Sequence, residues 1–349
     1  MTNLYGFTFM RGVDRLDYPY MEMLKSMSGI TSKIYVALGE SSDQTAEKIS
    51  TLANVEIIKT TWEDRYMGDG GKIFAQQANI ALDKLRAAHG DEEDAWALFL
   101  HCDEIIHPDE YSKLLQDLQL AISTGADAIR LRFLHFWKDH YHIASNKRWQ
   151  PAEIRLFKLK SDILCYGDAQ GFHQYQKQID SEVNLFHYGH VRPAEQHRLK
   201  QEEIMRRIRP ANKFNKYWKR ERRAFAKTKM LAINCHHPNF MRPRIERLND
   251  QFDLPTKKVI HLVGNPDEYS NYFKDHINVE NIYWHQVVQD VPAAERKERM
   301  VITQPRFWQH LLYQQPLSVK MESPSAEEWS KDMELLLRLS DKGYSQKGS

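Results

Sequence analysis

Two motifs with metal-binding side chains follow apolar runs that predict buried strands. Asp103 and Glu104 come directly after AWALFL at 95–100, the most apolar short run of the chain. His187 and His190 lie at the end of VNLFH, at 183–187, and just beyond it. Carboxylates suit Mg²⁺ or Mn²⁺, and an added imidazole favours Mn²⁺. The alternatives are an acidic turn that caps the next helix and histidines on the surface.

Two further groups of carboxylates lie in predicted loops. Asp168 stands in the glycine-containing stretch YGDAQGFH, where a carboxylate can act as a general base toward a hydroxyl. An Asx turn is the alternative role for it. Glu40 and Asp43 follow a predicted strand, where acidic residues hold the ribose or base of a nucleotide. Asp43 is also placed to cap a helix that begins at Thr45, and the two roles are compatible.

The elements that must position these residues alternate between short strands and helices. Strands are predicted at 3–10, 32–38, 55–59, 95–100, 128–133, 153–158 and 183–187, and helices at 18–27, 45–52, 72–89 and 109–123. This order predicts an α/β fold with a mostly parallel sheet flanked by helices. Ligands of such sheets bind beyond the carboxyl ends of the strands, where the candidate residues lie. The aromatic, histidine-rich stretch 135–149 is predicted to be a loop or an insertion.

The chain is long enough for one large domain with a smaller appendage. We predict a catalytic domain at 1–197, a basic helical segment at 198–255 that packs on it, and a small C-terminal α/β domain at 256–349. The last domain is expected to contain strands at 257–263, 281–288 and 300–303 and a helix at 325–340. Its sequence carries no phosphate-loop pattern, so we expect it to have a packing or partner-binding role.

Composition and charge narrow the class of protein. The formal net charge of the 349 residues is +2, whereas general nucleic-acid binders are usually strongly basic. The 3 cysteines are far apart in the sequence, which argues against a disulfide framework and favours a reducing compartment. No signal-peptide pattern and no membrane-length apolar run is present. We therefore expect a cytoplasmic protein.

The stretch 198–229 concentrates lysine and arginine around Tyr217, Trp218 and Phe225. An amphipathic basic helix of this kind suits an anionic membrane surface or an anionic glycan. The alternatives are a solvated helix face and a nucleic-acid-binding surface. The nearly neutral total charge counts against nucleic acid as the partner.

Taken together, the motifs resemble bacterial glycosyltransferases of family 2, which have the GT-A fold, over about residues 4–250. The resemblance rests on the order and spacing of GFTFMRG, IYVALGESSDQT, LFLHCDEII, RWQPAEIRLFK, YGDAQGFH, NLFHYGHVRP and HHPNFMRPRI. It implies a GT-A-like sheet and transfer of a hexose from a nucleotide-diphosphate sugar to a hydroxyl. The acceptor would be a glycan or lipid-linked glycan of cell-surface polysaccharide synthesis, at the inner membrane face, and the cofactor Mn²⁺ or Mg²⁺.

The resemblance also implies a role for each candidate residue. Asp103 would be the metal carboxylate, assisted by Glu104, and His187 would join the metal, with His190 as its substitute. Asp168 would be the base of an inverting displacement. The donor nucleotide would lie against Arg11, Glu40, Asp43, Asn79 and His101. The last of these departs from the family pattern, because a full D-x-D motif has an aspartate at that position. A nucleotidyltransferase is the alternative enzyme, since it also uses a strand-end carboxylate with a divalent ion.

Overall fold

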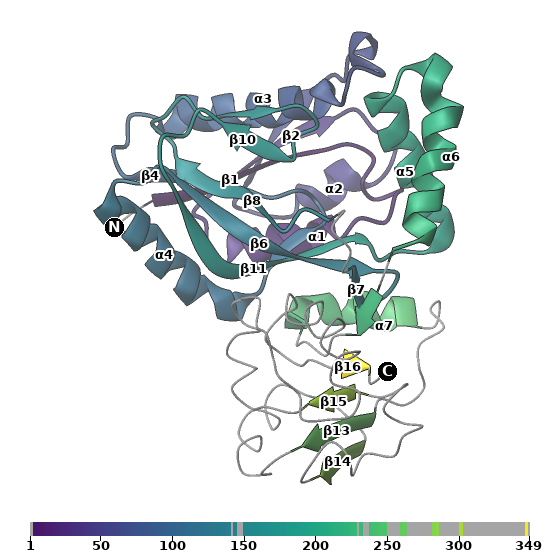
Figure 1. Cartoon of the computed structure of the whole chain (residues 1–349). Coiled ribbons are helices and arrows are strands. Elements are labelled where there is room, and N and C mark those ends of the chain that lie inside the picture. Colours follow the sequence, from purple (N-terminus) through teal and green to yellow (C-terminus); the bar gives the residue numbers. More distant parts are fainter. Residues whose placement is uncertain are drawn as a thin grey trace. The chain divides into compact units, whose positions relative to one another are not determined.

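The computed structural model describes residues 3–140, 142–144, 149–228, 230–232 and 237–249, and the backbones of strands at 259–263, 281–285, 300–302 and 346–347. The chain divides into two compact units (Figure 1). The first contains residues 1–133 and 150–227, and the second residues 134–149 and 228–349. Of the predicted basic segment, residues 198–227 therefore belong to the first unit and residues 228–255 to the second.

The first unit is built on a mostly parallel sheet, which confirms the predicted fold class. Its strands follow the order β6–β8–β4–β1–β2–β3. Their bounds are β1 (Asn3–Met10), β2 (Ile34–Gly39), β3 (Val55–Thr60), β4 (Ala95–Phe99), β6 (Ala128–Trp137) and β8 (Ala152–Lys158). β1 to β4 are mutually parallel, while β8 runs antiparallel to β4 and β6 antiparallel to β8. β2 and β4 are continuous apolar runs because both faces of the sheet are covered.

Two more strands extend this sheet beside the candidate motifs. The short β5 (Glu104–Ile106) follows Asp103 directly and pairs antiparallel with β11 (Gln178–His190). β11 also pairs with β6, and it is much longer than the strand predicted at 183–187. The register places His187 opposite Glu104, so this pairing joins two motifs that are far apart in the sequence.

Helices cover the sheet of the first unit (Figure 1). They are α1 (Tyr20–Ser28), α2 (Thr45–Ile49), α3 (Lys72–His89), α4 (Tyr111–Thr124), α5 (Ala194–Ile208) and α6 (Phe214–Ala226), with 3₁₀ turns at Asp64–Tyr66, Pro108–Glu110 and Ala211–Lys213. α3, whose predicted bounds are confirmed, packs on β1 and β2 through small residues such as Ala78 and Ala81. α4 packs on β11, and α5 packs against α6. None of the described helices has the length and apolar content needed to cross a bilayer.

A hairpin absent from the sequence prediction lies over the sheet. It consists of β9 (Leu164–Tyr166) and β10 (Gly171–His173), and its turn, residues 167–170, contains Asp168. The side chain of Phe172 on this hairpin is buried against Phe99 and Phe157, with ring centroids 5.2 and 4.9 Å apart. Phe7 of β1 completes the aromatic cluster, 5.1 Å from Phe99. This core therefore fixes the hairpin to the central strands.

The described residues of the second unit form two groups of strands and one helix. β7 (His142–Ala144) pairs antiparallel with β12 (Met230–Ala232), and a 3₁₀ turn (Asn239–Met241) precedes α7 (Arg242–Asn249). β13 (Val259–Val263) is parallel to β14 (Asn281–His285) and β15 (Met300–Ile302), and β16 (Gln346–Lys347) pairs antiparallel with β15. The helix predicted at 325–340 lies outside the described residues.

Of the loop or insertion predicted at 135–149, the loop is wrong at two places, because β6 continues to Trp137 and β7 occupies 142–144. The stretch 134–149 does interrupt the first unit in the sequence, as an insertion would. Phe136 pairs with Ile143 there, and both side chains are buried. These apolar side chains pack in pairs across the strands, a pattern that the surrounding histidines concealed in the sequence.

Replacing Phe99 by alanine should destabilise the first unit strongly. Its ring is fully buried and contacts rings from β1 and β10, so truncation leaves a cavity that costs about 3–5 kcal/mol. Urea unfolding of the full chain measures this change. Leu120→Ala is the control, because that side chain is exposed on α4 and its loss should change stability by less than about 0.5 kcal/mol. Equal effects of the two substitutions would contradict this description of the core.

Candidate functional site

Polar residues follow the central parallel strands at one edge of the sheet. β1 ends at Met10, β2 at Gly39 and β4 at Phe99, and their parallel registers bring the three carboxyl ends together. Arg11, Glu40 and the segment 101–104 come next along the chain. The structure thus gathers at one edge residues from three separate motifs, as expected for a ligand site of an open α/β sheet.

Asp103 and His187 meet at this edge. The distance from His187 Nε2 to Asp103 Oδ1 is 3.8 Å, and the backbone N–H of Tyr188 donates to the backbone O of Asp103 at 2.8 Å. Gly189 allows the approach, because a Cβ there would lie 2.5 Å from His187 Nε2 and 2.9 Å from Asp103 Oδ2. The two residues therefore share one tightly packed position, as the sequence reasoning required.

Two buried cations also contact Asp103. Lys200 Nζ, from α5, donates to Asp103 Oδ2 and to the backbone O of Gly189, both at 2.8 Å. Arg192 Nη2 lies 3.7 Å from the same carboxylate oxygen, while its Nη1 donates to the backbone O of Leu16 at 2.7 Å. We call Asp103, His187, Arg192 and Lys200 the Asp103 centre.

The charges of the Asp103 centre determine its protonation. Burial by itself raises the pKa of Asp103, but Lys200, His187 and Arg192 together hold that pKa well below its usual range. Burial lowers the pKa of Lys200, and the Asp103 carboxylate opposes this shift. The carboxylate is therefore ionised at neutral pH and neutralised by protein cations.

Glu104 is held in a separate buried ion pair. Arg155 of β8 donates to both of its carboxylate oxygens, through Nε at 2.9 Å and Nη2 at 2.8 Å. The backbone N–H of His101 adds a third bond at 3.0 Å. Burial raises the pKa of Glu104, but Arg155 and His101 more than offset this effect, so the pKa is lowered overall. The bidentate geometry occupies both oxygens of Glu104.

The turn that carries Asp168 is tied to the same edge. His101 Nε2 lies 2.8 Å from the backbone O of Ala169, and Arg155 Nη1 donates to the backbone O of Gln170 at 3.0 Å. Gly71, at the start of α3, faces Asp168 closely, because a Cβ on this glycine would lie 2.7 Å from that of Asp168. Gly71 also has a φ of 83°, which favours glycine. The half-buried Asp168 therefore belongs to the site edge.

The loops after β1 and β2 are joined to each other. Arg11 Nε donates to the backbone O of Glu40 at 3.1 Å, and Asp43 Oδ2 accepts the backbone N–H of Arg15 at 2.9 Å. Asp43 Oδ1 accepts the backbone N–H of Thr45 at 3.3 Å, but the N-cap residue of α2 is Gln44, and no side chain makes the capping bond there. Burial raises the pKa of Asp43, and these hydrogen bonds lower it further than burial raises it.

Two of the predicted site residues, Asn79 and His190, are hydrogen-bonded to other parts of the protein. Both amide atoms of Asn79 bond the backbone of Cys165 at 3.0 Å, which attaches β9 to α3. His190 Nδ1 lies 3.0 Å from His197 Nε2, and both residues are half-buried. Burial lowers the pKa of His190, with Lys200 adding to the shift, and lowers that of His197 to about 4. The proposed nucleotide contact of Asn79 and metal contact of His190 stay predictions.

The donor set does not fit a divalent ion. Within the described ranges, no three His, Cys, Asp or Glu side chains are grouped as metal ligands. Of the four predicted ligands, Glu104 is committed to Arg155, and Asp103 already contacts the ammonium of Lys200. A divalent ion at Asp103 would add charge beside two buried cations, which is electrostatically unfavourable. The Mn²⁺ or Mg²⁺ expected from the sequence therefore enters no step of the mechanism proposed below.

Three basic residues of this site escaped the sequence reasoning. The sequence did contain a signal for Arg155, because this charged residue lies between the apolar residues Ile154 and Leu156 of a buried strand. Arg192 lies inside the NLFHYGHVRP motif, two residues beyond the last predicted ligand. Lys200 had no distinguishing signal among the many basic residues that follow residue 198.

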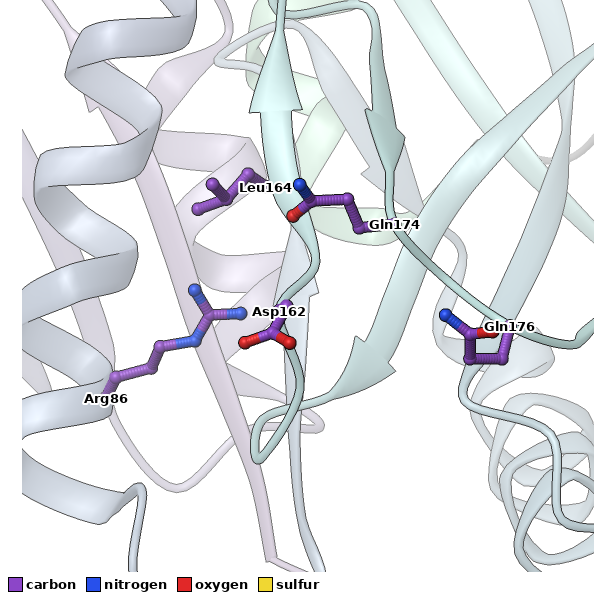
Figure 2. Close-up of a pocket in the computed structure, with 5 residues that line it drawn as sticks. All are labelled: Arg86, Asp162, Leu164, Gln174 and Gln176. Carbon is purple, nitrogen blue, oxygen red and sulfur yellow. The ribbon is translucent and has the colours of Figure 1, made fainter.

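A second polar feature lies at the other end of the β9–β10 hairpin from Asp168. Figure 2 shows this pocket, which is lined by Arg86, Asp162, Leu164, Gln174 and Gln176. The Arg86 side chain donates to the backbone O of Leu159 at 3.2 Å and of Ile163 at 2.7 Å, so it supports the base of the hairpin. None of the predicted site residues lines this pocket.

Comparisons with known proteins give distant structural likenesses. No family model matches the chain, and no curated protein does. Among solved structures, S. aureus TarS, a glycosyltransferase, in complex with UDP is similar at 13% identity, over 59% of this chain and 64% of that chain, with a TM-score of 0.34. A second TarS structure gives 10% identity, 99% and 60% coverage, and a TM-score of 0.33. The matches thus span less than two thirds of these TarS chains.

A 4-diphosphocytidyl-2C-methyl-D-erythritol synthase is similar at 14% identity, over 46% of this chain and 76% of that chain, with a TM-score of 0.29. Similarities with TM-scores this low give no evidence about the activity of this chain. The function is therefore argued from the residues of the site.

Substituting Arg155 by methionine should be among the most destabilising single changes at the site. It leaves the buried Glu104 carboxylate without its counter-charge, a loss of about 3–5 kcal/mol. Urea unfolding of the full chain measures the change, and adding Glu104→Gln should restore part of it. The control is Arg130→Met, which breaks an exposed pair with Asp180 and should cost at most about 1 kcal/mol. The buried ion pair is refuted if Arg155→Met lowers the free energy of unfolding no more than Arg130→Met does.

Proposed function

We propose that the first unit is a glycosyltransferase that moves a sugar from a nucleotide-diphosphate donor to a hydroxyl group, with inversion. The proposal rests on one observation. The Asp103 centre, the Asp168 turn and the loops after β1 and β2 lie at the same edge of a parallel sheet. This edge combines a positive centre for phosphates with a separate carboxylate for proton transfer. These are the two groups that displacement of a nucleoside diphosphate by a hydroxyl requires.

In this proposal the donor spans the edge of the sheet. Arg11, Glu40 and Asp43 contact the nucleoside, in keeping with the use of acidic strand-end residues for ribose in nucleotide-binding folds. The diphosphate lies toward the Asp103 centre, where His187 has the most exposed side chain, at 16%. His101 supports the Asp168 turn between these two regions through its bond to Ala169.

The proposed reaction is a single displacement at the anomeric carbon. Asp168 accepts the proton of the acceptor hydroxyl, and the resulting oxygen attacks the anomeric carbon from the face opposite the phosphate. The bond from the sugar to the diphosphate breaks, and the nucleoside diphosphate leaves with the negative charge. The cations of the Asp103 centre stabilise that charge because they are fixed before the reaction and shielded from water.

The proposed acceptor carries negative charge. α6 has no buried side chain, and most of its exposed residues are basic, namely Lys216, Lys219, Arg220, Arg222 and Arg223. Phe214 stacks on Trp218 in the same helix, with ring centroids 5.9 Å apart. Such a surface suits a glycan or lipid-linked glycan with anionic groups, at the surface of an anionic membrane.

A donor screen tests the proposed function directly. One class among UDP-, GDP- and dTDP-sugars should raise the melting temperature, because a ligand at 100 times its Kd adds about 2.7 kcal/mol to stability. The matching sugar 1-phosphate without the nucleotide is the control and should have little effect. Product analysis then separates the enzyme classes, since sugar transfer releases a nucleoside diphosphate and nucleotidyl transfer releases pyrophosphate. The proposal is rejected if no donor raises the melting temperature, or if the reaction releases pyrophosphate.

Asp168→Asn should remove catalysis while it preserves donor binding. Loss of a general base lowers kcat by about 10²–10⁴-fold, whereas the neutral amide keeps the shape of the turn. Transfer assays give kcat, and the donor-induced rise in melting temperature reports binding. Asp162→Asn, at the base of the same hairpin, is the matched control and should retain wild-type kcat. If the two variants have similar kcat values, Asp168 is not the base.

A further inference from the structure

We propose that Lys200 and Arg192 occupy the electrostatic place of a divalent cation at Asp103, so that the site works without a bound metal. The first part of this statement concerns the protein alone. The second part, metal-free donor binding, rests on the proposed function. Both follow from how the carboxylate, the ammonium and the guanidinium are packed together.

The ammonium of Lys200 takes the contacts that a bound cation would take. Its Nζ lies 2.8 Å from both Asp103 Oδ2 and the backbone O of Gly189, and 4.9 Å from the centroid of the Tyr18 ring. A carboxylate, a carbonyl and an aromatic face therefore surround it, and only 6% of the side chain is exposed. Mg²⁺ or Mn²⁺ at the same oxygens would have to displace this ammonium.

Arg192 adds a second positive charge that few protein acceptors satisfy. Its guanidinium is fully buried and lies 4.2 Å from the centroid of the Tyr18 ring. Nη1 donates to the backbone O of Leu16, but Nε and Nη2 have no hydrogen-bond acceptor. Buried N–H groups are normally paired, so these two donors leave the positive charge of Arg192 only partly compensated by the protein.

The charge count of the Asp103 centre points the same way. In the Asp103 centre one carboxylate faces two buried cations, and the neighbouring Glu104 is already neutralised by Arg155. The Asp103 centre therefore carries a positive surplus before any ligand binds. An anion such as a diphosphate reduces this surplus, whereas a divalent cation increases it. The centre is accordingly built for an anion.

Manganese titration of the purified full chain tests the first part of the proposal. Electron paramagnetic resonance reports free Mn²⁺, and the wild-type chain should show no saturable site up to millimolar concentration. Lys200→Met should raise the affinity for Mn²⁺ at least about tenfold, because it releases Asp103 and leaves it near His187. Adding Asp103→Asn to that variant should abolish the gain.

The matched control is Lys113→Met, which breaks a similar Lys–Asp pair on α4, at 2.9 Å from Asp117. It should leave Mn²⁺ binding as in the wild type. Circular dichroism checks the folding of each variant. If Lys200→Met does not fold, the titration of the wild-type chain still tests whether Asp103 binds Mn²⁺. Saturable Mn²⁺ binding by the wild type that Asp103→Asn removes, or no gain in folded Lys200→Met, would overturn the proposal.

Donor binding tests the second part separately. The rise in melting temperature caused by the best nucleotide sugar should be the same in EDTA as in Mn²⁺, and Lys200→Met should weaken it in EDTA. A rise that requires Mn²⁺ would overturn metal-free binding. If no nucleotide sugar binds under either condition, the proposed function fails, while the manganese titration still decides whether Lys200 occupies the cation position.

Discussion

The burial of the Asp103 carboxylate constrains the rest of the site. A buried charge is costly unless other charges and hydrogen bonds compensate it. Compensation here requires Lys200 from α5 and Arg192 from the segment after β11 to reach the end of β4. The pairing of β5 with β11 supplies this geometry, because it draws residues 187–192 alongside residues 103–106. The architecture around the edge thus follows from one carboxylate that must remain ionised inside the protein.

A second buried ion pair, between Glu104 and Arg155, connects the site edge to the Asp168 turn. Arg155 neutralises Glu104 and, through another nitrogen, holds the backbone O of Gln170. His101 holds the neighbouring Ala169, so two residues of the sheet edge secure the hairpin that carries the proposed base. The aromatic core beneath, with Phe172 packed on Phe99, fixes the same hairpin from below. Stability and proposed chemistry are therefore coupled, since the contacts that position Asp168 also neutralise a buried charge.

The site departs from the metal centre that the family resemblance implies. Asp103 and His187 do converge, but the remaining partners are an ammonium and a guanidinium instead of further metal ligands. Glu104, which the sequence offered as a second metal carboxylate, forms a bidentate pair. Fixed protein cations and a metal ion both favour a developing phosphate anion, but only fixed cations require no ion from solution. In the proposed function, Lys200 and Arg192 supply at this strand-end position the positive charge that a metal ion would supply.

The sequence by itself determined the parallel α/β fold, the bounds of α3 and the place of Arg11, Glu40 and Asp103 beyond the ends of β1, β2 and β4. Local periodicity carries that information, because a buried strand and an amphipathic helix have distinct apolar patterns. Tertiary structure alone decided the partners of Asp103 and Glu104. Lys200 lies 97 residues from Asp103 in a stretch rich in basic residues, and nothing local distinguishes the lysine that docks inward from those that face solvent. Which cation neutralises a buried carboxylate depends on how α5 packs, and that is a property of the folded chain.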